Sequence, residues 1–292
     1  MGVVIRLYTD PGCPWSWGAE PKLRRLDWEF GRSLEWRYVM GGLARSFGPD
    51  YRDTEARITG EGSCFDGLVA NWLDVAAETG MPTDPRIWHQ SPLSSTYPAC
   101  QGVKAAADQG PEATGRYLRR AREAIMVERR KADHAEALVA LAGEAGLNLE
   151  RFRIDLASNA TLEAFAADLD EVRTVPDDAR AAEKVATTEG RERVSFPSAV
   201  FVAEGGERHG VWGSQPYDAY REAALSAGAE VVADGEPGPI DAIERFGRCA
   251  TQELEVLTGK PRPVLEADLW ALAREWRLRP VPVLTGTLWE LP

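Results

Sequence analysis

A short apolar strand that ends in a turn and leads directly into a helix constrains the fold of this chain most strongly. Residues 3–9 alternate apolar and polar side chains, and Asp10-Pro11-Gly12 interrupts the strand. Apolar residues at helical spacing follow this turn as far as a stop at Gly31, and residues 34–40 have strand character again. Because the connection is a helix, we expect two parallel strands in a right-handed β-α-β unit.

The pattern changes to helical spacing between residues 54 and 189. The last helix of this stretch is predicted at 176–188. Strand character returns at 194–203 and 208–213, where Gly205-Gly206 favours an antiparallel hairpin, and a helix is predicted at 217–227. Residues 54–189 are therefore predicted to form a large helical insertion inside an α/β domain.

A Gly- and Pro-rich segment at 233–239 marks a domain boundary. Beyond it, three helices and a terminal strand pair around Thr285-Gly286 are predicted. This part is either a winged-helix-like module or a segment that packs on the main body. The predicted organisation joins residues 1–53 and 190–230 in one α/β domain, with 54–189 inserted and 240–292 as a small, mainly helical C-terminal extension.

Composition narrows the classes of partner. The chain has 46 acidic and 34 basic residues and a formal net charge of -12, which opposes binding to phosphate backbones, and its basic residues form no separate patch. No apolar run approaches the roughly 18 residues that cross a bilayer, and the first residues are too short an apolar stretch for a signal peptide. We expect a cytoplasmic protein with no nucleic-acid or membrane partner.

The cysteines point to thiol chemistry at one place. Cys13, Cys64, Cys100 and Cys249 show no C-x-x-C pairing, which argues against a metal site. Cys13 stands between the strand-ending turn and the helix, where unpaired N–H groups and the helix dipole favour a thiolate. Cys13 is therefore predicted to be acidic and nucleophilic, and the alternative is a structural cysteine that begins a helix.

The residues around Cys13 carry a family resemblance. Asp10-Pro11-Gly12-Cys13-Pro14-Trp15-Ser16-Trp17 resembles the active-site turn of the DsbA-like branch of thioredoxin-fold proteins, FrnE-like proteins included. The resemblance implies a thioredoxin fold over residues 1–230. It also places Pro197 at the family's cis-proline position, where the backbone of the preceding residue, Phe196, binds substrate. Pro14, Trp15, Phe196 and Pro197 are the implied substrate-binding residues.

Ser16 departs from the family pattern because it stands where a resolving cysteine is usual. A hydroxyl cannot attack a mixed disulfide, so we expect a monothiol oxidoreductase in which Cys13 acts on a protein or small-thiol substrate and another thiol, such as glutathione, resolves it. Ser16 either donates a hydrogen bond to the thiolate or satisfies backbone groups of the first turn. Cys100, at another predicted helix start, is either a distant resolving thiol or a packed core residue. No further cofactor is expected.

Two other functions stay open. The turn also resembles that of kappa-class glutathione transferases and 2-hydroxychromene-2-carboxylate isomerases, with Cys13 at the catalytic serine. There, Gln215 of Val211-Trp212-Gly213-Ser214-Gln215 replaces an acidic residue that holds glutathione. Alternatively, some cytosolic DsbA-like proteins resemble non-catalytic protease adaptors, for which the extra tail and the ten tryptophans would suit partner binding. Tryptophans in a chain of this length more often anchor the core, and we prefer that interpretation.

Overall fold

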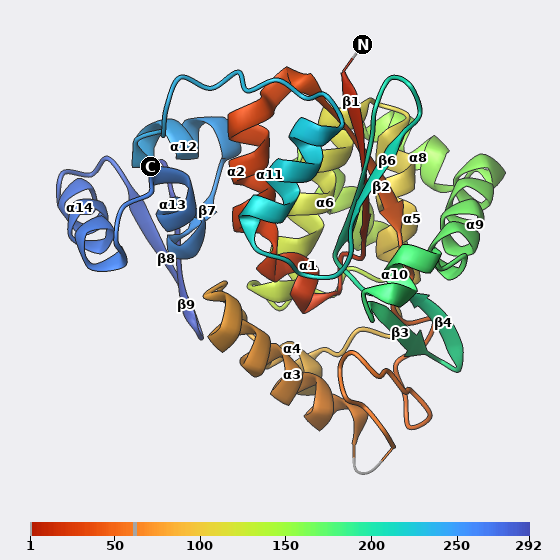
Figure 1. Cartoon of the computed structure of the whole chain (residues 1–292). Helices are drawn as coiled ribbons and strands as arrows, with labels where there is room; N and C mark the ends of the chain where they lie inside the picture. The colour runs from red at the N-terminus through yellow and green to blue at the C-terminus, as the bar shows by residue number, and fades with distance from the viewer. Residues whose placement is uncertain (1, 61–62) are drawn as a thin grey trace.

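The computed structural model describes residues 2–60 and 63–292. Its central sheet contains the strands β1 (Val3–Thr9), β2 (Leu34–Met40), β5 (Ser198–Val202) and β6 (Arg208–Val211), in the order β2-β1-β5-β6. Strand β1 pairs parallel with β2, whereas β5 is antiparallel to both β1 and β6 (Figure 1). The predicted parallel β-α-β unit and the antiparallel hairpin are confirmed, and so is the α/β thioredoxin-like fold class.

Two successive helices follow β1 in place of the single helix expected. Helix α1 (Pro14–Gly18) is followed by the capping residue Ala19, and α2 (Glu20–Phe30) continues to the predicted stop at Gly31. The short 3-10 helix η1 (Gly31–Ser33) comes next. Helix α2 and α11 (Tyr217–Ser226) bury apolar side chains against one face of the sheet. That core contains Ile5, Leu26, Phe30, Phe201 and Tyr220.

The insertion is mainly helical and covers the other side of the sheet (Figure 1). Its helices are α3 (Cys64–Thr79), α4 (Ile87–Gln90), α5 (Tyr97–Ala107), α6 (Pro111–Met126), α7 (Ala135–Glu144), α8 (Leu149–Leu156), α9 (Asn159–Arg173) and α10 (Asp177–Ala181). The prediction of one helix over 176–188 is wrong. Only α10 forms, because Val185, Thr187 and Thr188 favour a strand and Gly190 turns with φ 76°.

The residues after α10 form a separate hairpin of β3 (Val185–Thr188) and β4 (Arg191–Val194). The single strand expected at 194–203 is therefore divided. Ser195, Phe196 and Pro197 form the break between β4, which belongs to this small hairpin, and β5, which belongs to the central sheet. This break matters for function because it carries the Phe196-Pro197 pair.

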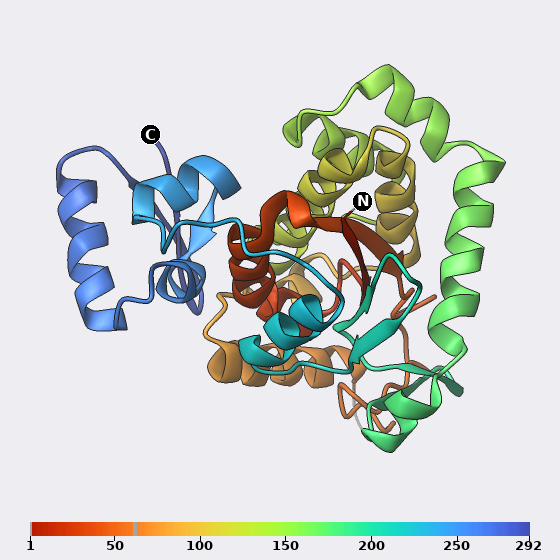
Figure 2. The ribbon, with the colours of Figure 1, turned by 45° about the horizontal axis from the view of Figure 1, so that its top comes forward.

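The C-terminal extension forms α12 (Pro239–Phe246), β7 (Cys249–Ala250), α13 (Thr251–Thr258), α14 (Arg262–Arg274), β8 (Arg279–Val283) and β9 (Gly286–Glu290). Its sheet has the order β7-β9-β8. The extension stands beside α2, on the opposite side of the molecule from α9 (Figure 2). Its likeness to a winged-helix module stays a prediction, as do the domain boundaries.

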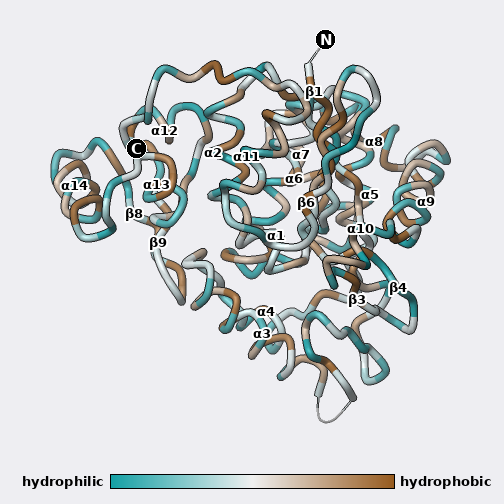
Figure 3. Tube along the Cα trace, in the orientation of Figure 1, coloured by the Kyte–Doolittle hydropathy of each residue, from teal (hydrophilic) through white to brown (hydrophobic). Residues whose placement is uncertain are grey.

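Polar contacts attach the extension to the main body. The connection before α12 crosses α2, where Val232 and Ala233 donate to the carbonyl of Glu29 (2.8 and 3.1 Å), and Figure 3 shows a hydrophobic stretch within it. The fully buried Glu253 of α13 accepts a hydrogen bond from Arg119 (2.7 Å) and forms an ion pair with Arg24 (3.1 Å) of the main body. The extension therefore packs on the main body, which was the second of the two possibilities that the sequence left open for residues 240–292. Among the described residues, no helix is long and apolar enough to cross a membrane.

Candidate thiol site at the start of helix α1

Cys13 is the N-cap residue of α1, as the strand-turn-helix pattern predicts. Its backbone N–H donates to the carbonyl of Asp10 (3.2 Å), which closes the turn, and Pro14 occupies the first helical position. The Sγ atom accepts a hydrogen bond from the backbone N–H of Ser16 at 3.5 Å. The thiol therefore uses one of the N–H groups that a helix start leaves unpaired.

The carboxylate of Asp10 accepts the hydrogen bonds that fix the turn before Cys13. Its Oδ1 accepts from the N–H of Gly12 (2.7 Å), as expected for an aspartate before Pro-Gly. Its Oδ2 accepts from the N–H of Leu43 (2.7 Å), the hydroxyl of Thr96 (3.0 Å) and the thiol of Cys100 (3.3 Å). Cys100 is thus a buried side chain that donates to Asp10, which favours the packed-core reading over that of a resolving thiol.

The Phe196-Pro197 pair lies at the break between β4 and β5, and its peptide bond is cis. Ser198 fixes the break, since its hydroxyl donates to the carbonyl of Ser195 (2.7 Å) and accepts from the N–H of Gly213 (2.8 Å). Phe196 and Cys13 belong to one hydrophobic cluster, although they are far apart in the sequence.

Gly41 makes room for the Phe196 ring. A Cβ atom at position 41 would lie 2.0 Å from Cζ of Phe196, so only glycine fits here. Gly41 follows β2 and donates to the carbonyl of Thr9 at the end of β1 (2.7 Å). The ring of Phe196, which belongs to the same hydrophobic cluster as Cys13, therefore packs where β2 ends beside the end of β1.

Trp15 and Ser16, which follow Pro14 in helix α1, each have a buried polar side-chain atom without a geometric hydrogen bond among the described residues. The hydroxyl of the fully buried Ser16 and the indole N–H of the partly buried Trp15 are both in this position. The backbone N–H of Ser16 donates to the sulfur of Cys13, and the Ser16 side chain also lowers the pKa of that thiol. Substrate contacts by Pro14, Trp15, Phe196 and Pro197 stay predictions.

The burial of Cys13 and the charges near it contradict the predicted acidity of its thiol. The side chain is 1% exposed, and burial, followed by the negative charge of Glu55, raises the pKa of the thiol to about 12. The opposing effects of the Ser16 side chain, the Ser16 N–H and the Arg193 guanidinium are smaller. The prediction of an acidic Cys13 is therefore wrong for this conformation, because desolvation of a thiolate outweighs the helix start.

Sequence reasoning missed the charged residues that face Cys13. Arg193 of β4 is 3% exposed and pairs with Glu55 (3.0 Å) and with Asp53 (3.2 Å). Its guanidinium also lies over the Phe196 ring, 4.3 Å from the centroid. The one available signal was Arg193 itself, a charged residue directly before the strand predicted at 194–203. It could not reveal the partners, which lie some 140 positions earlier.

The segment 211–215 makes its contacts elsewhere. The side-chain amide of Gln215 donates to the carbonyl of Trp212 (2.9 Å), and the indole of Trp212 donates to Asp178 (2.9 Å). Gln215 thus closes its own turn at the position where the transferase resemblance expects an acidic residue.

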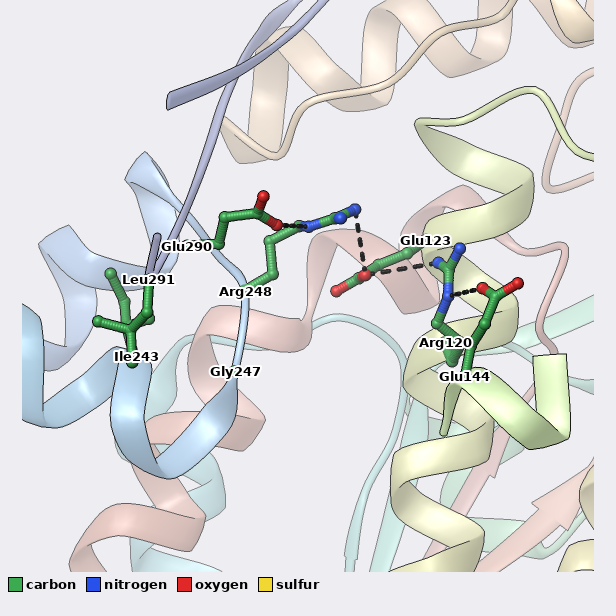
Figure 4. Close-up of a pocket in the computed structure, with 8 residues that line it drawn as sticks. All are labelled: Arg120, Glu123, Glu144, Ile243, Gly247, Arg248, Glu290 and Leu291. Carbon is green, nitrogen blue, oxygen red and sulfur yellow. Dashed lines mark hydrogen bonds and ion pairs between the residues drawn. The ribbon is translucent and has the colours of Figure 1, made fainter. Parts of the chain in front are cut away.

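A concave surface separate from the thiol site lies between the extension and α6. Figure 4 shows Arg248 between Glu290 (2.8 Å) and Glu123 (3.6 Å), and Arg120 next to Glu144 (2.7 Å). These residues line a recess of about 460 Å³. A larger cleft of about 960 Å³ shares Arg120 and Arg248 and extends to Trp36 and Tyr38 of the edge strand β2.

Comparisons with known proteins show which proteins this chain resembles. A protein-family model described as thioredoxin matches residues 7–175. The ClpXP adapter protein SpxH of Halalkalibacterium halodurans is 26% identical over 302 residues, which cover 98% of this chain and 88% of the relative. SpxH of Bacillus subtilis is 25% identical over 292 residues, with the same two shares.

A solved structure has the same fold. The cytosolic disulfide reductase DsbM from Pseudomonas aeruginosa, determined with GSH, superposes with a TM-score of 0.54 and 20% sequence identity. The match covers 76% of this chain and 99% of DsbM. The adapter relatives thus match nearly the whole chain, including most of the extension, whereas the reductase matches about three quarters of it.

Proposed function

The chain belongs to the thioredoxin family, and from that premise we propose that it is a protease adapter that binds a client protein and presents it to ClpXP. The observation that carries the proposal is the extension at 239–290, fixed on the thioredoxin-like body by Glu253. Relatives named as ClpXP adapters match 98% of the chain, so the resemblance includes this added part.

The thiol site also fits a binding role better than rapid redox turnover. Cys13 is buried, its pKa is raised to about 12, and Ser16 cannot resolve a mixed disulfide. Burial and a high pKa keep the sulfur in its unreactive thiol form at neutral pH. The fold therefore serves chiefly as a scaffold.

The surface offers places for protein partners. The cleft of about 960 Å³ carries Trp36, Tyr38 and several arginines, which are residue types enriched at interfaces. On the extension, Trp276 is 85% exposed and Trp270 is 50% exposed. Exposed tryptophans of this kind are typical anchors of a protein interface.

The test is reconstitution with ClpX and ClpP purified from the organism that encodes the chain. Adding the chain to a soluble extract with ClpXP and ATP should accelerate degradation of a small set of proteins, measured by quantitative mass spectrometry. Those proteins are then purified and degraded in the defined mixture. Cys13→Ala should leave the acceleration intact, while Trp276→Ala should weaken it with little change in stability.

Two results would contradict the adapter proposal. One is that no purified protein is degraded faster in the presence of the chain. The other is that acceleration is lost with Cys13→Ala but kept after Trp276→Ala and after removal of residues 239–292, which would assign activity to the thiol.

A second candidate function is a monothiol oxidoreductase, favoured by the position of Cys13 as the N-cap of α1 next to the cis Phe196-Pro197 bond. In this cycle the Cys13 thiolate attacks a disulfide R–S–S–R and forms Cys13–S–S–R, releasing one thiolate. A second small thiol then attacks the mixed disulfide, restores Cys13 and leaves with R as a new disulfide.

Exposure to glutathione disulfide followed by intact-mass analysis tests this candidate. One glutathione adduct that maps to Cys13, disappears with added glutathione and is absent from Cys13→Ser supports it. No adduct at Cys13, or adducts that form equally on Cys64, excludes a selective monothiol site.

A further inference from the structure

The turn between Asp53 and Ile58 supplies the two acidic partners of Arg193 and is fixed at its base. Asp53 and Ile58 exchange two backbone hydrogen bonds (3.1 and 2.9 Å), and the N–H of Ala56 donates to Asp53 Oδ1 (2.8 Å). Thr54 bonds to the carbonyl of Thr187 in the β3–β4 hairpin (3.1 Å). We call residues 53–58 the covering turn.

The covering turn presents two carboxylates to one guanidinium. Arg193 Nη2 contacts Asp53 Oδ2 at 3.2 Å and Glu55 Oε2 at 3.0 Å. Its Nε donates to the hydroxyl of Thr188 (2.9 Å) and its Nη1 to the carbonyl of Val194 (3.0 Å). Arg193 is thus held in place by groups other than Glu55.

The two carboxylates differ in exposure. The side chain of Asp53 is 1% exposed, and that of Glu55 is 18% exposed. Burial raises the pKa of Glu55 above its usual value, while Arg193 and the backbone of Phe196 favour the charged form. Asp53 is therefore the structural partner of Arg193, and Glu55 is the partner that can leave without dismantling the turn.

Glu55 also occupies the surroundings of Cys13, where its charge disfavours a thiolate and Arg193 favours one. If Glu55 left, the charge next to the sulfur would become more positive. The position of Arg193 agrees with this, because its guanidinium lies over the ring of Phe196, 4.3 Å from the centroid, and Phe196 and Cys13 belong to one hydrophobic cluster.

We propose that Arg193 forms a carboxylate-binding site beside Cys13, that Glu55 fills it as an internal substitute, and that its ligand is a small thiol or disulfide that carries a carboxylate. The ligand's carboxylate would replace Glu55 on Arg193, and its sulfur would lie next to that of Cys13. This inference goes beyond the adapter role, since it requires neither ClpXP nor the extension, and it concerns binding whether or not Cys13 turns over.

The test compares iodoacetate and iodoacetamide, which alkylate a thiol by the same displacement of iodide and differ in the carboxylate. Rates at Cys13 are measured by peptide mapping in the wild type and in Glu55→Gln, which keeps the size of the side chain and removes its charge. The ratio of the iodoacetate rate to the iodoacetamide rate should rise at least about threefold in Glu55→Gln, because Arg193 has lost one anionic partner.

Glu192→Gln is the matched control, because Glu192 lies next to Arg193 on β4 but is 56% exposed and pairs with Arg180. Its ratio should equal that of the wild type. Acetate should protect Cys13 of Glu55→Gln from iodoacetamide in a saturable way, and chloride at the same ionic strength should not. An acetate effect equal to that of chloride would show a general charge effect and overturn the site.

A ratio in Glu55→Gln equal to that in Glu192→Gln would overturn the proposal as well. If Glu55→Gln fails to fold, which reaction at the buried Cys100 would reveal, Glu55→Asp replaces it. The shorter aspartate should open the site in part and raise the ratio, and an unchanged ratio in folded Glu55→Asp would equally refute the site.

Discussion

The thiol of Cys100 donates a hydrogen bond to Oδ2 of Asp10 across 3.3 Å, which ties the start of α5 to the turn that holds Cys13. The same carboxylate accepts from the N–H groups of Gly12 and Leu43 and from the hydroxyl of Thr96. All these partners are donors, and Asp10 is fully buried. The site is thus organised around one acceptor.

Asp10→Asn is therefore expected to destabilise the protein by about 2 kcal/mol, because the amide NH₂ would point a donor at other donors in a buried place. Urea unfolding followed by circular dichroism measures the loss. Asp50→Asn, at an exposed position of the loop after β2, should change the stability by less than about 0.5 kcal/mol. Equal stabilities of the two variants would show that Asp10 is not the organising acceptor.

Glu253 gives a prediction about the extension. Glu253→Gln removes the charge that pairs with Arg24 and Arg119, which leaves both buried guanidinium groups short of a partner. We expect a loss of about 3 kcal/mol in the free energy of unfolding. The extension should also loosen, so that limited proteolysis cuts the connection at 233–238 sooner than in the wild type.

An exposed pair provides the comparison for that variant. Glu275 lies 3.7 Å from Arg277, and both side chains are more than half exposed. Glu275→Gln should cost less than about 1 kcal/mol and leave the cleavage rate unchanged. Faster cleavage in both variants would mean that the connection opens independently of the Glu253 contacts.

Local signals were sufficient to predict the central architecture. The alternation in residues 3–9 and 34–40, with a helix between them, predicted the parallel pair β1–β2, and the helical spacing at 54–189 predicted a mainly helical insertion. The Cys13 turn was also visible, because a helix start leaves a local signature of turn residues and proline. The FrnE-like placement within the family stays a prediction.

Long-range charge pairing could not be predicted in the same way. Glu55 and Arg193 come from segments that each look like ordinary solvated surface, and only the packing of the covering turn on the β3–β4 hairpin brings them to Cys13. The acidity of Cys13 was misjudged for that reason: the helix start is local and visible, whereas the burial and the Glu55 charge are not. The 176–188 helix failed for a local reason, because strand-favouring residues in β3 and their pairing with β4 outweigh the helical tendency of the alanines before them.

Gly41 supplies a packing prediction. Gly41→Ala would place a Cβ atom 2.0 Å from Cζ of Phe196, so the ring or the end of β2 must shift, at a cost of about 1–3 kcal/mol. Displacing Phe196 should also expose Cys13 and speed its alkylation. Gly48→Ala is the control, since no atom lies within 4 Å of its added Cβ. An unchanged melting temperature for Gly41→Ala would refute the tight contact.

The raised pKa of Cys13 has a consequence for pH. In the folded chain the thiol keeps its proton to about pH 12, against an ordinary value of 9.0. Below pH 9 both folded and unfolded chains carry the neutral thiol, so this group does not alter stability there. Between pH 9 and 12 the unfolded chain releases the proton and the folded chain retains it, so stability falls as the pH rises through this window.

The same shift sets the alkylation profile. The rate of iodoacetamide reaction at Cys13 should rise about tenfold per pH unit from pH 7 to 10 without levelling off, because the thiolate fraction keeps increasing below the pKa. In urea, the rate at Cys13 should level off near pH 9. The contrast persists if the reagent reaches only transiently opened molecules, since the closed thiol form dominates the population up to about pH 12. A plateau below pH 8 in the folded chain would mean that Cys13 is an acidic thiol after all, and would return the redox function to first place.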